Sequence, residues 1–171
     1  TIRIDPMKFE QNWTDNKAEN WMRRLGHLVD TKCIILQIGV WEGRSSVWFC
    51  RNILTHGESI LVDVDPFRDS VYLDRYLRNL AEANFLSKVE LWRIPSHRMH
   101  LASESVDAVY VDGSHKACDV LTDLVLSWRG LKREGIMIVD DYWWPGSLKI
   151  DHLPPKPAID AFLSIFSDQM D

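Results

Sequence analysis

The stretch CIILQIGVWEGRSSVWFCRNIL, residues 33–54, decides the fold of this chain. Its first four residues form a short apolar, β-branched run that is typical of a buried strand. Gly39 and Gly43 follow, and then Ser45 and Ser46 open an apolar segment with helical spacing. Glycine allows a sharp turn and a close approach of the backbone to a ligand. The stretch therefore predicts a strand, a glycine turn and a helix, with either serine as its N-cap and free N–H groups at its start.

Strand and helix patterns alternate along the rest of the chain. Four more apolar runs predict strands, at residues 59–65, 89–94, 106–111 and 136–139. Helical spacing of apolar residues recurs at residues 14–30, 73–84, 117–131 and 159–166. This alternation is typical of a parallel sheet covered on both faces. We therefore expect a doubly wound, Rossmann-like α/β fold with strand order 3-2-1-4-5 and no closing antiparallel strands. It would form one domain over residues 1–171, with an N-terminal arm and helix over residues 1–31.

Composition limits the classes of partner. The chain has 171 residues, a net charge of −5 and no basic run, which disfavours nucleic acid. No apolar stretch reaches the roughly 20 residues of a membrane helix. The three cysteines lack CxxC spacing and are interpreted as reduced core residues of a cytoplasmic protein. The G-x-x-x-G spacing also differs from the G-x-G-x-x-G of nicotinamide and flavin enzymes.

Polar residues gather where the predicted strands end. In an open parallel sheet, ligands bind beyond the carboxyl ends of the strands. The residues at these ends are Gly39, Gly43, Asp63, Asp65, Ser96, His97, Asp112, His115, Asp140 and Asp141. Asp63 lies 20 residues after Gly43, where an acid can accept hydrogen bonds from the two hydroxyls of a ribose. A solvated loop carboxylate is the equal alternative, and Asp65 is the lesser candidate.

Three of these carboxylates predict a metal site. Asp112, Asp140 and Asp141 follow two strands that we expect to be neighbours. They would repel one another unless positive charge lies among them, and Mg²⁺ prefers oxygen ligands. Helix capping by Asp112 and Asp141 is the alternative. His115, three residues after Asp112, is placed to act as a general base, or else is a helix N-terminal residue without a catalytic role.

Two segments resemble a known family. Residues 35–46, ILQIGVWEGRSS, resemble the first motif of class I S-adenosylmethionine-dependent methyltransferases. Residues 106–143, VDAVYVDGSHKACDVLTDLVLSWRGLKREGIMIVDDYW, resemble the small-molecule O-methyltransferases related to macrocin O-methyltransferase and catechol O-methyltransferase. The resemblance implies methyl transfer from S-adenosylmethionine to a hydroxyl of a small molecule, assisted by Mg²⁺.

The resemblance also assigns roles to individual residues. Those implied to bind the cofactor are Gly39 and Gly43 at the methionine part, Asp63 at the ribose, and Ser96 and His97 at the adenine. Asp112, which also lies in the cofactor site, would bind Mg²⁺ with Asp140 and Asp141, and His115 would be the catalytic base. Gln37 replaces the acid that usually opens the first motif, and we assign it a weaker contact with the cofactor.

Some features depart from that family. Trp41 and Glu42 are bulky where small residues are common, and the closing strands are missing from the pattern. A homodimer partner is left open as the source of a substrate lid. Trp143 and Trp144 are placed to form an aromatic wall for the acceptor, and packing in the core or in an interface is the equal alternative. Two alternatives remain. One is a cofactor-binding domain without transfer activity. The other is a haloacid dehalogenase-type phosphatase, suggested by the sequence LVDVD at residues 61–65.

Overall fold

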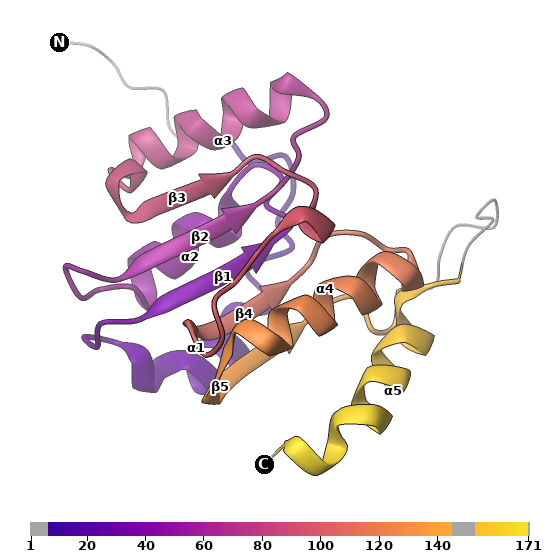
Figure 1. Cartoon of the computed structure of the whole chain (residues 1–171). Helices are drawn as coiled ribbons and strands as arrows, with labels where there is room; N and C mark the ends of the chain where they lie inside the picture. Colours follow the sequence, from indigo (N-terminus) through magenta and orange to yellow (C-terminus); the bar gives the residue numbers. More distant parts are fainter. Residues whose placement is uncertain (1–6, 145–152, 171) are drawn as a thin grey trace, which may run out of the picture.

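The computed structural model describes residues 7–144 and 153–170, so part of the predicted N-terminal arm, residues 1–6, lies outside the described residues. Five strands form one parallel sheet in the order β3-β2-β1-β4-β5 (Figure 1). Their bounds are β1 Ile34–Ile38, β2 Ile60–Val64, β3 Val89–Trp92, β4 Val106–Val111 and β5 Leu131–Val139. The prediction of a doubly wound parallel sheet with this strand order is confirmed.

Five α-helices flank the sheet. Their bounds are α1 Ala18–Leu25, α2 Arg44–Asn52, α3 Ser70–Glu82, α4 Ala117–Gly130 and α5 Pro155–Phe166. Short 3₁₀ turns span Gly26–Leu28, Leu86–Lys88, Ser96–Arg98 and Ser167–Gln169. Within the described ranges, no helix has the length and apolarity required to cross a membrane.

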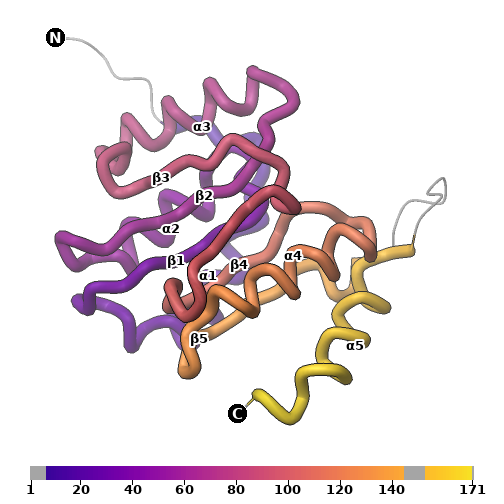
Figure 2. The backbone as a smooth tube through the Cα atoms, viewed as in Figure 1, coloured from indigo at the N-terminus to yellow at the C-terminus, as the bar shows by residue number. Residues whose placement is uncertain are grey.

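Successive strand residues point to opposite sides of the sheet. Both faces therefore carry apolar side chains, and the helices cover both. In β1, Leu36 and Ile38 pack in one apolar cluster with residues of α4 and α5. Ile35 points the other way and packs with residues of α1 and α2. A third cluster, around Tyr76, attaches α3. Figure 2 shows α4 and α2 on opposite sides of the strands. The carboxyl ends of the strands are thereby left open for a site.

Two local predictions were wrong. The N-cap of α2 is Gly43, with φ of 78° and no side-chain cap, so Ser45 and Ser46 belong to the first turn instead. Strand β5 begins at Leu131 rather than at residue 136. Its charged residues 132–134 are exposed, which an edge strand tolerates because one side of it faces solvent.

The cysteines divide into two kinds. Cys33 and Cys50 are buried free thiols, as predicted, but Cys118 is exposed. It lies in the first turn of α4, whose buried side is formed by Val120 and Leu124. Cys118 therefore projects from the solvent side of that helix and is not a core residue.

Candidate active site

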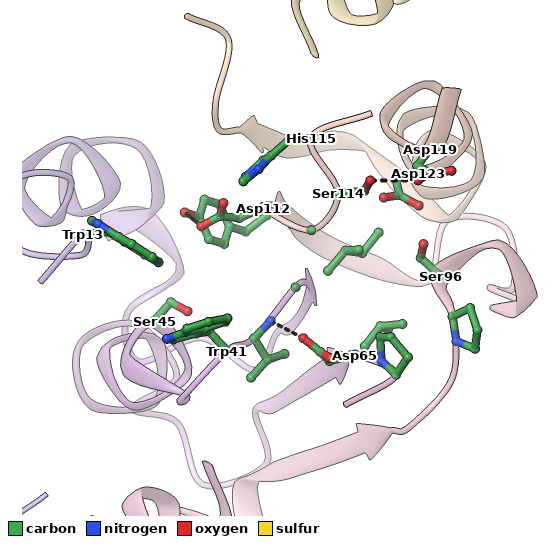
Figure 3. A pocket seen from close by; sticks show the side chains of 18 of the residues that line it. Trp13, Trp41, Ser45, Asp65, Ser96, Asp112, Ser114, His115, Asp119 and Asp123 are labelled. Carbon is green, nitrogen blue, oxygen red and sulfur yellow. Dashed lines mark hydrogen bonds between the residues drawn. The ribbon is translucent and has the colours of Figure 1, made fainter. Parts of the chain in front are cut away.

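A cavity of about 610 Å³ opens at the carboxyl edge of the sheet (Figure 3). Its lining comes from the loops after β1 to β4, from the starts of α2 and α4, and from the segment that leads into α1. Ligand sites for small molecules usually measure roughly 300–1,000 Å³. The cavity is therefore large enough for a nucleoside-containing ligand together with a second small molecule.

The glycine turn after β1 brings two loops into contact. Gly39 lines the cavity and has φ of 83°. A Cβ at this position would lie 2.1 Å from the carbonyl oxygen of Asp112, so only glycine fits between the ends of β1 and β4. Gly43 does not line the cavity, and a Cβ there would lie 2.7 Å from the Tyr76 ring. In the structure this glycine makes room for α3, and its packing on the cofactor stays a prediction.

The acid that reaches the cavity from β2 is Asp65 and not Asp63. Asp63 lies within the strand, paired in register with Gln37, and has no exposed surface. The Tyr76 hydroxyl donates a 2.8 Å hydrogen bond to it, and burial raises its pKa to about 7. Asp65 follows the strand and lines the cavity, where its carboxylate accepts hydrogen bonds from the N–H groups of Val40 (2.9 Å) and Phe67 (2.8 Å).

The burial of Asp63 contradicts two predictions. Asp63 cannot hold a ribose, because no part of it is accessible to a ligand. The alternative phosphatase reading of residues 61–65 is also wrong, because Asp63 and Asp65 do not face one site together.

Gln37 lies beneath the cavity and does not line it. It has no exposed surface, and its amide nitrogen donates hydrogen bonds to the Ser45 hydroxyl (2.6 Å) and to the Gly39 carbonyl (3.0 Å). Ser45 does line the cavity. The predicted contact of Gln37 with the cofactor was therefore wrong. This side chain supports the floor of the cavity.

The loop after β3 forms the far end of the cavity. Ser96 and His97 line it, as the sequence led us to expect, together with Asp123 of α4 (Figure 3). Asp123 is buried, which raises its pKa to about 6, and its Oδ1 atom has no hydrogen-bond partner among the described residues. This residue was not among those predicted from the sequence. Its signal is an acid on the same helical face as the buried residues Val120 and Leu124.

Asp112 and Asp140 meet at the hydroxyl of Tyr110. That oxygen lies 2.7 Å from a carboxylate oxygen of each. Lys17 forms an ion pair with the same oxygen of Asp140. Burial, and then the negative charge of Asp140, raise the pKa of Asp112 to about 7. The two carboxylates were predicted at this place, but Tyr110 and Lys17 were not.

His115 and Asp141 form the second half of this cluster. His115 Nε2 lies 2.8 Å from Asp141 Oδ2, and this hydrogen bond raises the pKa of His115 and lowers that of Asp141. The imidazole stacks on Trp144, with ring centroids 4.5 Å apart. Single ligand atoms of Asp112, His115 and Asp141 all lie within 4.8 Å of one another. The structure thus brings the three predicted carboxylates and the predicted base into one network.

The aromatic wall of the cavity differs from the predicted one. Trp143 and Trp144 are absent from its lining; Trp143 is 79% exposed and packs edge-on against Tyr142. Trp13 and Trp41 line the cavity instead, and Figure 3 places them at the end opposite Ser96 and Asp123.

The strand order, the glycine turn and the acid beyond β2 define a Rossmann-like protein built to bind a nucleoside-containing ligand. More narrowly, the chain belongs to the methyltransferase-domain family, which it matches over residues 36–142. This match covers more than half of the chain and confirms the resemblance to class I S-adenosylmethionine-dependent methyltransferases. No curated protein matches the sequence.

Solved structures share the fold at low sequence identity. TomG, an O-methyltransferase from Streptomyces achromogenes solved with S-adenosylmethionine, has a TM-score of 0.61 and 18% identity over 93% of this chain and 79% of its own. A candidate O-methyltransferase from Klebsiella pneumoniae has a TM-score of 0.67 and 15% identity over 93% and 71%. Phosphoethanolamine N-methyltransferase 1 from Haemonchus contortus, solved with S-adenosylhomocysteine, has a TM-score of 0.54 and 15% identity over 74% and 26%. The chain spans 49%, 42% and 61% of the length of three other matching structures.

Proposed function

We propose that the chain transfers a methyl group from S-adenosylmethionine to a hydroxyl oxygen of a small molecule. One observation carries this proposal. A single cavity joins a carboxylate suited to a ribose, Asp65, to a cluster that can accept a proton, centred on Asp112 and His115. Membership of the methyltransferase-domain family supports the donor, and the TomG likeness is the basis for choosing oxygen as the acceptor atom.

The donor fits the end of the cavity that Asp65 and Asp123 form. Each oxygen of the Asp65 carboxylate accepts one backbone N–H and keeps a lone pair for a ribose hydroxyl. Ser96 and His97 line the same end of the cavity beside Asp123, and the adenine would lie against them. The bound donor supplies a methyl group on a sulfonium sulfur, and transfer exchanges its carbon–sulfur bond for a carbon–oxygen bond, leaving a thioether and one proton to be removed.

His115 is assigned the proton. Its Nε2 atom is engaged by Asp141, so the neutral imidazole offers Nδ1 to the acceptor hydroxyl. The Asp141 carboxylate holds the ring in orientation and stabilises the imidazolium that forms, as the acid does in other histidine–carboxylate pairs. Stacking on Trp144 restrains the same ring.

A divalent cation, Mg²⁺ by preference, is the second part of the proposal. The ligand atoms of Asp112 and Asp141 are close enough to share one ion, and carboxylate oxygens suit Mg²⁺. Asp140, which the sequence assigned as a third ligand, is engaged by Lys17 and Tyr110. A cation at Asp112 and Asp141 would lower the pKa of an acceptor hydroxyl and orient it.

The test uses the purified chain with donor carrying a deuterated methyl group. We expect mass spectrometry to find the label on oxygen in one or more members of a panel of small phenols, sugars and alcohols. A matched panel of amines tests nitrogen as the acceptor atom. Donor binding without transfer to any acceptor would support the non-catalytic donor-binding domain instead. If calorimetry detects no binding of S-adenosylhomocysteine, both the methyl-transfer proposal and the donor-binding alternative are overturned.

The cation is tested separately in the same assay. With chelator present, the rate should fall if Asp112 and Asp141 hold an assisting ion, and added Mg²⁺ should restore it. An unchanged rate in chelator would remove the cation from the proposal and leave His115 as the proton acceptor.

A further inference from the structure

Lys17 occupies an unusual place in the carboxylate cluster. Its ammonium group pairs with Asp140, it lines the cavity, and its side chain is only 26% exposed. It comes from the segment that precedes the family-matched residues 36–142. The positive charge therefore reaches the strand ends from outside the sheet and its βα loops.

The position of Lys17 is fixed by packing. Its backbone N–H bonds to the carbonyl of the buried residue Thr14 at 3.1 Å. One helical turn further on, Trp21 is 2% exposed and lies edge-on against the Tyr110 ring, with centroids 5.0 Å apart. Residues four apart share a helix face, so Trp21 holds the ring of Tyr110 while Lys17 reaches the carboxylates that its hydroxyl joins.

An ion held by Asp112 and Asp141 would share this space with the ammonium group. Lys17 pairs with the Asp140 oxygen that also lies 2.7 Å from the Tyr110 hydroxyl, and the same hydroxyl lies 2.7 Å from a carboxylate oxygen of Asp112. Like charges at such short range repel. The same ammonium group offsets the repulsion among the three carboxylates. Lys17 therefore supplies part of the positive charge that the predicted metal was needed to provide.

We propose that Lys17 is a resident cation of this site and competes with a divalent cation for its carboxylates. The inference deepens the cation site proposed above and rests on it. In the wild-type protein the ammonium group weakens metal binding. For a metal ion to bind, the Lys17 side chain must move away from the carboxylates. The residue that caps the start of α1 thereby sets the metal affinity of a site whose ligands all lie on other elements.

The test is Mn²⁺ binding to the whole chain by calorimetry, without donor or acceptor. We expect Lys17→Met to bind Mn²⁺ at least about tenfold more tightly than the wild type. Lys17→Arg keeps the charge and should bind as weakly as the wild type. Lys32→Met is the matched control for net charge, because Lys32 is exposed and pairs with Glu58 away from the cavity. In the Lys17→Met background, Asp141→Ala removes the ligand oxygen and should abolish the gain.

Three results would overturn the proposal. These are equal Mn²⁺ affinities of the wild type and Lys17→Met, an equal gain in Lys32→Met, or a gain that survives Asp141→Ala. If Lys17→Met does not fold, Lys17→Gln replaces it, with far-ultraviolet circular dichroism as the check. Absence of Mn²⁺ binding in every variant overturns the competition and the cation site together. The methyl-transfer proposal stands or falls separately, on the labelled-donor assay.

Discussion

Asp63 shows how one buried carboxyl can shape the stability of the whole chain. Its pKa is raised to about 7 by burial, above the ordinary value of 3.8. The unfolded state therefore loses the proton near pH 4 while the folded state keeps it until about pH 7. The contribution of Asp63 to the free energy of unfolding is therefore largest below pH 4. It falls as the pH rises from 4 to 7 and is constant above pH 7, with a total change of roughly 2–4 kcal/mol.

The first prediction follows from that sign. Asp63→Asn removes the titration and keeps an oxygen for the Tyr76 hydroxyl. We expect its free energy of unfolding, relative to the wild type, to increase by roughly 2–4 kcal/mol between pH 4.5 and pH 8. Urea unfolding at several pH values measures it. A difference that does not change with pH would show that Asp63 titrates normally in the folded state.

The second prediction separates Asp65 from Asp63. Asp65→Ala should weaken binding of S-adenosylhomocysteine by about 1.5–3 kcal/mol, the range for hydrogen bonds to a charged group. Asp63→Asn is the matched control and should bind nearly as the wild type does, since Asp63 has no exposed surface. Calorimetry on both variants decides the point. Loss of binding only in the Asp63 variant would reverse our assignment.

The third prediction concerns His115. His115→Gln should lower kcat by roughly 10²–10⁴-fold, the usual contribution of a general base. The affinity for S-adenosylhomocysteine should stay unchanged, because the donor end of the cavity lies at Asp65 and Asp123. Single-turnover rates and calorimetry together measure both quantities. A wild-type rate in this variant would mean that another group takes the proton.

Single residues were harder to predict than elements, for a physical reason. The apolar run and the acids around residue 63 indicate where β2 lies, but the site depends on whether the strand ends before or after Asp63. The strand ends at Val64, so Asp63 is enclosed by the sheet and Asp65 reaches its edge. Gln37 was misassigned for the same reason, because it lies beside Asp63 in the neighbouring strand β1. Asp112 and His115 could be placed because they follow a strand that ends just before them.

At the scale of elements, α1 is attached to the sheet mainly through one aromatic side chain. Trp21 is almost fully buried and contacts Phe49 and Tyr110, with ring centroids 4.9 and 5.0 Å away. The fourth prediction is that Trp21→Ala lowers the free energy of unfolding by about 3–5 kcal/mol.

Trp143→Ala is the matched control for Trp21→Ala. Trp143 is 79% exposed, so its removal should change stability by no more than about 0.5 kcal/mol. Urea unfolding of both variants gives the comparison, and equal effects would contradict the anchoring role of Trp21.

The elements themselves were largely predictable. Apolar runs identified all five strands that the described residues contain, because each strand of a covered parallel sheet is buried on both faces. The start of β5 was missed, because its first half is charged and exposed at the sheet edge. The approach of α1 to the site could not be foreseen, since it depends on how Trp21 packs against residues far away in sequence.

For the whole molecule, donor binding should be visible as stability. The fifth prediction is that S-adenosylhomocysteine at 100 times its Kd stabilises the folded state by about 2.7 kcal/mol. Thermal unfolding followed by tryptophan fluorescence measures this effect, with adenine alone as the control ligand. A melting temperature that is insensitive to the ligand would contradict donor binding.

The cavity is assembled from two separable lengths of chain. The loops after β2 and β4 supply Asp65 and Asp112, helix α4 supplies Asp123, and Trp13 and Lys17 come from the segment that leads into α1. Exchanging residues 7–17 between related chains would therefore replace Trp13 and Lys17 together, while Trp21, Asp65, Asp112 and Asp123 stay in place.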